Sequence, residues 1–120
     1  MVDDDDGVRY LTKRILETLG FEVLQAEDGE HGLALFQANA GRAALALVDL
    51  TMPRMGGAEM LRRLRALDGT LPVILMSGYS ETDALALTSS WRNIWFVQKP
   101  FAADALIPVV AMAVDAPRVT

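Results

Sequence analysis

The 120-residue sequence has no cysteine, a single histidine (His31) and no run of basic residues. Without cysteine there can be no disulfide, thiolate metal site or cysteine nucleophile, and one histidine cannot form a histidine metal cluster. Because the formal net charge is −5, we do not expect direct nucleic-acid binding, which needs clustered lysine and arginine. The apolar stretches are too short to span a bilayer, and the acidic N-terminus is unlike a signal peptide. These absences predict a cytoplasmic domain without membrane contacts.

The remaining composition is that of a folded domain, with 52% hydrophobic and 22% charged residues. Short apolar runs alternate five times with segments of helical spacing, which predicts an α/β domain with a doubly wound parallel sheet. We expect a single domain over residues 1–120, with residues 115–120 as a tail or the start of a linker. The predicted strands are residues 1–2, 21–26, 45–48, 72–76 and 94–97, and the predicted helices are residues 8–19, 29–40, 55–67, 81–90 and 102–114. Pro108 falls inside the last of these helices and should bend or restart it.

One predicted strand is followed directly by a carboxylate. Residues 45–48 form an apolar run typical of a strand buried on both faces, and Asp49 follows directly. In open α/β sheets, reactive groups lie outside the carboxyl ends of the strands. The alternative is that Asp49 only ends a strand. Other predicted strands also end in polar residues, so we expect one cleft to collect several of them, namely Asp3, Asp4, Asp49, Ser77 and Lys99.

This set of side chains predicts a cation site for phosphoryl transfer. Two carboxylates about 4 Å apart repel by roughly 4 kcal/mol at an effective dielectric near 20. Oxygen ligands without histidine or cysteine favour Mg²⁺ or Mn²⁺, and a metal, a lysine and a hydroxyl around Asp49 suit that carboxylate as the nucleophile. A solvated charge run at residues 3–6 is the alternative. A calcium loop does not fit, because Lys13 stands where a bidentate glutamate is needed.

Four short pieces of the sequence, at residues 2–4, 48–57, 76–78 and 99–101, together resemble the receiver domain of two-component response regulators. The resemblance implies a flavodoxin-like fold, with a five-stranded parallel sheet of order 2-1-3-4-5 flanked by five helices. Residues 78–81 and 96–101 look like the C-terminal receivers of hybrid sensor histidine kinases. A stand-alone regulator, or the receiver of a larger one, remains an alternative.

The resemblance also implies roles for individual residues. Asp49 would take a phosphoryl group from a phosphohistidine on a sensor histidine kinase or histidine phosphotransfer protein. Mg²⁺ would be held by Asp4, Asp49 and the backbone carbonyl of Thr51, with Asp3 acting through a water. The residues implied to bind the phosphoryl group or to switch with it are Lys99, Ser77, Phe96, Gly78 and the backbone of Leu50; Thr51 and Tyr79 would tune the lifetime of the phosphorylated state, and the Lys99–Pro100 peptide would be cis.

The implied activity is a phosphorylation switch rather than an enzyme acting on a separate substrate. The switch would act on the face formed by helix 4, strand 5 and helix 5, through which a homodimer could form. Two alternatives stay open: a degenerate receiver-like interaction domain, and a haloacid dehalogenase-type phosphohydrolase, which would need an aspartate where Thr51 stands. The first strand is unusually short, because only Met1 and Val2 precede Asp3. Either it begins ahead of Met1, or it stays short, or another segment fills its place.

Overall fold

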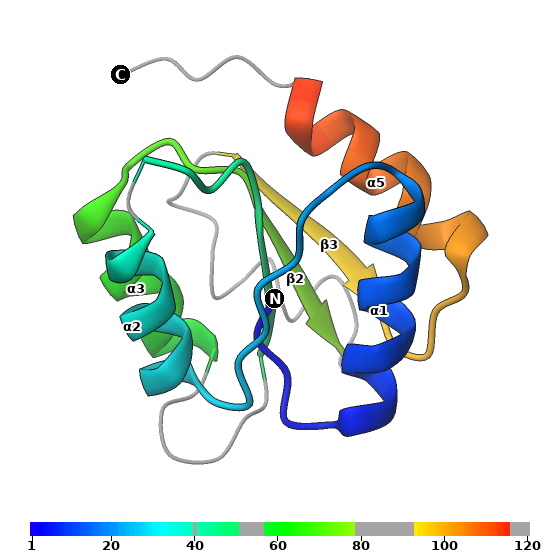
Figure 1. Cartoon of the computed structure of the whole chain (residues 1–120), viewed down its shortest axis with the longest axis horizontal. Helices are drawn as coiled ribbons and strands as arrows, with labels where there is room; N and C mark the ends of the chain where they lie inside the picture. Colours follow the sequence, from blue (N-terminus) through cyan, green and yellow to red (C-terminus); the bar gives the residue numbers. More distant parts are fainter. Residues whose placement is uncertain (40, 51–56, 79–92, 116–120) are drawn as a thin grey trace.

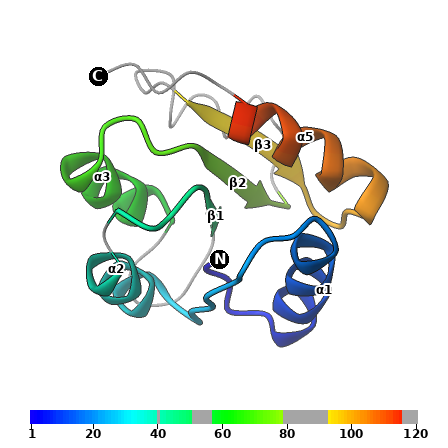
Figure 2. The ribbon, with the colours of Figure 1, turned by 45° about the horizontal axis from the view of Figure 1, so that its top comes forward.

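The computed structural model describes residues 1–39, 41–50, 57–78 and 93–115. In these ranges α1 and α5 cover one face of a parallel sheet, and α2 and α3 cover the other (Figures 1 and 2). The predicted helix at residues 81–90 lies outside the described residues. No helix among the described residues is both long and apolar enough to cross a membrane. In chain order the elements are α1 (Asp6–Thr18), α2 (Gly29–Ala38), β1 (Ala46–Asp49), α3 (Gly57–Leu67), β2 (Val73–Ser77), β3 (Ile94–Gln98) and α5 (Ala103–Asp115).

The sheet has the strand order that the resemblance implies. Strands β1, β2 and β3 are parallel and neighbour one another in that order. Val2 forms parallel bridges to Ala26 on one side and to Val48 of β1 on the other. Counted with these two bridging segments, the order is 2-1-3-4-5, as in a doubly wound sheet.

Strand residues alternate between two apolar cores, which is why β1 and β2 read as continuous hydrophobic runs. Val48 and Leu75 pack into the core on the α2 and α3 side. Leu47 and Ile74 pack into the core on the α1 and α5 side. All four side chains are at most 3% exposed, so the prediction of strands buried on both faces is confirmed.

Aspartates begin the two N-terminal helices. The Asp5 carboxylate accepts a hydrogen bond from the Val8 backbone N–H at 3.0 Å, and that of Asp28 accepts from the His31 N–H at 2.9 Å. Each satisfies a backbone donor that the first helical turn leaves unpaired. His31 itself is exposed, as expected for a residue on an outer helix.

Two predicted elements differ in the structure. Residues 21–25 are not a strand, and only Ala26 pairs with Val2 as a bridge. A strand needs a partner along its length, and the short segment ahead of Asp4 supplies one only at its end. The second difference concerns Pro108, which was expected to bend or restart the last helix. Instead α5 continues through it from Ala103 to Asp115 without a restart.

Candidate functional site

Four polar residues meet at the carboxyl edge of the sheet. Asp49 ends β1, Ser77 ends β2, and Lys99 follows β3 directly. The Lys99 backbone N–H donates to the Ser77 carbonyl at 2.7 Å, so the β2–β3 ladder continues to the edge. Asp3 reaches the same edge because Val2 is paired beside Val48. The sequence prediction that these strand ends meet is confirmed.

Asp3, Asp4 and Asp49 form an acidic cluster. Each contributes a carboxylate oxygen, and these oxygens lie within 4.8 Å of one another. Asp3 and Asp49 are buried, at 0% and 2% exposure, whereas Asp4 is exposed. Carboxylates this close, two of them shielded from water, require positive charge nearby. The donor set is entirely oxygen, which suits a hard divalent cation.

Lys99 supplies part of that positive charge. Its Nζ lies 2.7 Å from Asp3 Oδ2 and 3.1 Å from Asp49 Oδ2. Burial alone would lower the pKa of Lys99, but the hydrogen bonds and negative charges of Asp3 and Asp49 outweigh it and raise that pKa. The side chain is therefore an ammonium ion at neutral pH and bridges the two buried carboxylates.

The loop that carries Asp3 and Asp4 is held by Arg9. One guanidinium nitrogen of Arg9 donates to the Asp3 carbonyl at 2.6 Å, and another pairs with the Asp6 carboxylate. Asp3 Oδ1 in turn accepts from the Asp5 N–H at 2.9 Å. Sequence reasoning missed Arg9. The available signal was its spacing of three residues from Asp6 at the start of a helix.

The predicted switch residues are only partly covered by the structure. Ser77 is fully buried, and Phe96 is half-buried against the core on the α2 and α3 side. Gly78 is exposed, and an added Cβ there would contact no other atom. Thr51 and Tyr79 lie outside the described residues. The peptide bond between Lys99 and Pro100 is cis.

The Leu50 backbone, which the resemblance implies to bind the phosphoryl group or to switch with it, takes part in the sheet, and its implied role stays a prediction. Its N–H donates to the Met76 carbonyl at 3.0 Å. The reason is that the β1–β2 ladder extends one residue beyond β1, so this donor is already used within the sheet. Among the described residues, the Lys99 ammonium and the Ser77 hydroxyl are the side-chain donors that the sheet brings to this edge.

Comparison with known proteins decides the family. The profile of the response regulator receiver domain matches residues 1–111. The chain belongs to the response regulator receiver family. It is 30% identical over 106 residues to sporulation initiation phosphotransferase F of Bacillus subtilis, covering 88% of this chain and 84% of that protein. Other curated relatives are longer, and the chain spans 12% to 44% of the three transcriptional regulatory proteins and the one sensor kinase among the first five.

Solved receiver structures share the fold. The receiver domain of the hybrid histidine kinase CckA superposes with a TM-score of 0.81 at 33% identity, covering 95% of both chains. A CheX–CheY complex with BeF₃ and Mg²⁺ from Borrelia burgdorferi contains a chain with a TM-score of 0.84 at 25% identity, covering 97% of this chain and 87% of that one. The receiver family comprises phosphoacceptor domains of two-component signalling, and this chain is one of them.

Proposed function

We propose that Asp49 is the phosphoacceptor and that it takes a phosphoryl group from a phosphohistidine on a sensor histidine kinase or histidine phosphotransfer protein. The observation that carries this proposal is the Asp49 carboxylate, buried at the sheet edge in an acidic cluster, with the Lys99 ammonium at 3.1 Å. A nucleophilic carboxylate between a cation and a fixed ammonium has the parts that phosphoryl transfer requires.

In the transfer, an Asp49 carboxylate oxygen forms a bond to phosphorus while the bond from phosphorus to the histidine nitrogen breaks. The departing imidazole keeps the electron pair of that bond. Lys99 binds a phosphoryl oxygen, and to do so its ammonium turns from the Asp49 oxygen that it contacts in the unphosphorylated domain. A metal ion held at the acidic cluster would supply further charge neutralisation for the phosphoryl oxygens.

Asp4, Asp49 and the backbone carbonyl of Thr51 would hold Mg²⁺ or Mn²⁺, and Asp3 would act through a water. Both carboxylate oxygens of Asp3 already have partners, which supports a place for Asp3 outside the direct ligands of the metal. One oxygen accepts from the Asp5 N–H, and the other is paired with Lys99. Asp4 is exposed and is free to turn toward an ion that keeps some of its waters.

The phosphoryl group changes the surface beside the site. The phosphoryl group carries a charge of about −1.5 to −2, which replaces the single negative charge of the Asp49 carboxylate beside Ser77 and Gly78. The Ser77 hydroxyl donates to it, and Phe96 then moves inward from its half-buried position against the core. Thr51 and Tyr79 tune how long the phosphorylated state lasts. The face that responds includes β3 and α5, through which the domain contacts partners or a second copy of itself.

In this proposal the domain assists its own phosphorylation and slow dephosphorylation in the cytoplasm, and has no separate substrate to turn over. It serves as a stand-alone receiver or as the receiver of a larger protein such as a hybrid histidine kinase.

Intact mass after incubation with acetyl phosphate tests the proposal. We expect a single phosphoryl adduct that requires both Mg²⁺ and Asp49, and is absent in Asp49→Asn. Asp28→Asn is the matched control, because Asp28 is also buried but caps α2, and asparagine caps helices equally well. If the folded protein formed no phosphoryl adduct, the domain would be one that binds partners without being phosphorylated. Release of phosphate over many turnovers would instead indicate a phosphohydrolase.

A further inference from the structure

The side chain of Arg9 folds back over the loop that carries Asp3 and Asp4. Although Arg9 belongs to a helix at the surface, its side chain is only 15% exposed, whereas that of its ion-pair partner Asp6 is 91% exposed. One guanidinium nitrogen donates to the Asp3 backbone carbonyl at 2.6 Å, and another pairs with the Asp6 carboxylate. The planar fork of an arginine makes both contacts at once, so Arg9 ties the loop to the start of α1.

The helix by itself does not account for this arginine. Because α1 begins at Asp6, Arg9 stands in its first turn, where the helix dipole favours negative rather than positive side chains. The ion pair with Asp6 contributes little, since the Asp6 carboxylate is almost fully exposed to water. The stronger contact is the part-buried hydrogen bond to the Asp3 carbonyl, which the charge of the guanidinium strengthens.

This hydrogen bond lies at the point where the chain leaves the sheet. The Asp3 N–H still donates to the Ala26 carbonyl of the neighbouring segment at 3.1 Å, whereas the Asp3 carbonyl is held by Arg9. Because a peptide group is planar, holding this carbonyl fixes the peptide that leads into Asp4. The peptide that leaves Asp4 is held as well, since the Asp5 N–H donates to Asp3 Oδ1 at 2.9 Å.

The Asp4 carboxylate depends on these backbone contacts for its place. Its side chain is exposed, and among the described residues no hydrogen bond or ion pair holds the carboxylate. One of its oxygens nevertheless lies within 4.8 Å of oxygens of Asp3 and Asp49. Like charges at this distance repel each other. The backbone of Asp4 therefore keeps its carboxylate in the acidic cluster.

We propose that Arg9 is a positioning residue for the metal site, which holds the Asp3–Asp4 peptide so that the Asp4 carboxylate stays beside Asp49. The inference rests on the proposed function, because it takes Asp4 as a ligand of Mg²⁺ or Mn²⁺. Contacts made to the residues around a metal site, rather than to the metal, commonly orient the ligands. The charge of Arg9 acts in the opposite sense, since a cation beside the cluster repels a metal ion.

Position and charge therefore predict opposite effects of removing Arg9, and titration calorimetry with Mg²⁺ distinguishes them. Arg9→Gln removes the charge and the fork, whereas Arg9→Lys keeps the charge without the fork. We expect Mg²⁺ affinity to fall in both variants, by about 10–100-fold in Arg9→Gln. In the metal-free Arg9→Gln variant, amide hydrogen exchange at Asp5 should also become faster, because the loop is less well held.

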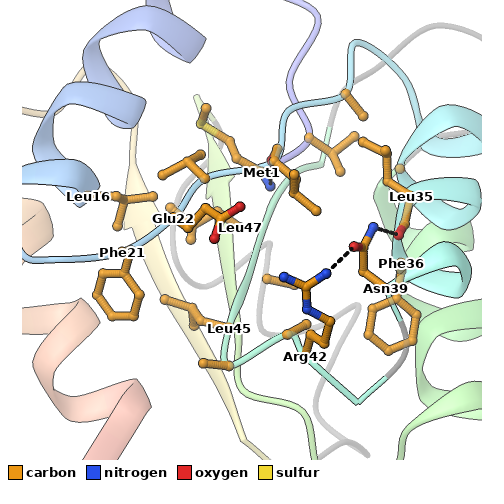
Figure 3. A pocket seen from close by; sticks show the side chains of 18 of the residues that line it. Met1, Leu16, Phe21, Glu22, Leu35, Phe36, Asn39, Arg42, Leu45 and Leu47 are labelled. Atoms are coloured by element: carbon orange, nitrogen blue, oxygen red, sulfur yellow. Dashed lines mark hydrogen bonds between the residues drawn. The ribbon is translucent and has the colours of Figure 1, made fainter.

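Arg42→Gln is the matched control. Arg42 lines a cavity at the opposite edge of the sheet and, like Arg9, contacts a residue three positions away, donating to Asn39 Oδ1 at 3.5 Å (Figure 3). The control makes the same change of charge far from the acidic cluster. It should leave both Mg²⁺ affinity and amide exchange at Asp5 unchanged.

Unchanged or tighter Mg²⁺ binding in folded Arg9→Gln, or an equal loss in Arg42→Gln, would overturn the proposal. Near-UV circular dichroism establishes that each variant is folded. If Arg9→Gln does not fold, Arg9→Lys decides, and wild-type affinity in that variant would overturn the proposal. Failure of the proposed function is a different result, in which the wild-type protein binds Mg²⁺ but forms no adduct at Asp49. A wild-type protein that binds no Mg²⁺ would overturn both.

Discussion

The Lys99 ammonium lies 3.1 Å from the Asp49 carboxylate, although the two residues are 50 positions apart in the sequence. The same ammonium lies 2.7 Å from Asp3. One lysine therefore contacts two buried carboxylates and offsets part of their negative charge, which a divalent cation at the acidic cluster would also offset. This competition between the ammonium and a metal leads to the first prediction.

Replacing Lys99 by glutamine should strengthen Mg²⁺ binding while slowing phosphorylation of Asp49. Without metal, the variant should lose roughly 3 kcal/mol of folding free energy, because two buried carboxylates are left without a cation. Added Mg²⁺ should restore more stability to it than to the wild type. Titration calorimetry and denaturant unfolding measure both effects, with Lys13→Gln, which changes the other lysine, as the control. Weaker Mg²⁺ binding in Lys99→Gln would show that the ammonium does not compete with the metal.

Asp4→Asn should weaken Mg²⁺ binding by about tenfold or more, because the exposed carboxylate is proposed as a direct ligand. The same change should leave stability without metal unchanged or slightly higher, since one repulsive charge is removed from the cluster. Asp5→Asn is the control, because asparagine keeps the cap of α1 and Asp5 is not part of the cluster. Equal losses of Mg²⁺ affinity in the two variants would remove Asp4 from the ligand set.

Gly32→Ala should destabilise the fold by about 1–3 kcal/mol. An added Cβ at Gly32 would lie 2.6 Å from Val2 Cγ2 and 2.7 Å from Met60 Cε. Val2 cannot withdraw easily, because its backbone is bonded on both sides. Gly69→Ala is the matched control, since an added Cβ there meets no atom within 4 Å. Denaturant unfolding gives the comparison, and a loss shared equally by both variants would argue against close packing of α2 on the first strand.

Ser77→Ala should separate phosphorylation from switching. The variant should still form the Asp49 adduct, but more slowly. The Phe96 ring should keep the environment that it has in the unphosphorylated domain, because no hydroxyl is present to donate a hydrogen bond to the phosphoryl group. Ser77→Thr keeps the hydroxyl and should restore the response. NMR with and without a phosphodonor measures the change in the Phe96 ring signals. A normal ring response in phosphorylated Ser77→Ala would exclude the hydroxyl as the link.

Much of the fold follows from apolar patterning. Residues 45–48 and 94–97 were predicted as strands, and the structure has them as β1 and β3, shifted or extended by one residue. The prediction for residues 21–26 was wrong except at Ala26, because strand formation depends on a partner that the pattern of one segment cannot show. At Pro108 the last helix does not restart: α5 continues through it, and Leu106 and Val110 on either side of it are packed in the core.

The site was predictable where it depends on strand ends. Asp3, Asp49, Ser77 and Lys99 each end or follow a strand, so the sheet edge alone brings them together. Backbone donors could not be assigned this way. The Leu50 N–H depends on how far the β1–β2 ladder extends, and that length is set by pairing with Met76 rather than by the identity of Leu50.

The most direct test of the account is to locate the phosphoryl group. Acetyl phosphate and Mg²⁺ would be followed by borohydride, which reduces an aspartyl phosphate to homoserine, and by peptide mapping with mass spectrometry. The account predicts homoserine at position 49 and unmodified aspartate at Asp3, Asp4 and Asp28. Homoserine at Asp3 or Asp4, or none in folded protein that carries a phosphoryl adduct, would contradict the claim that Asp49 is the phosphoacceptor.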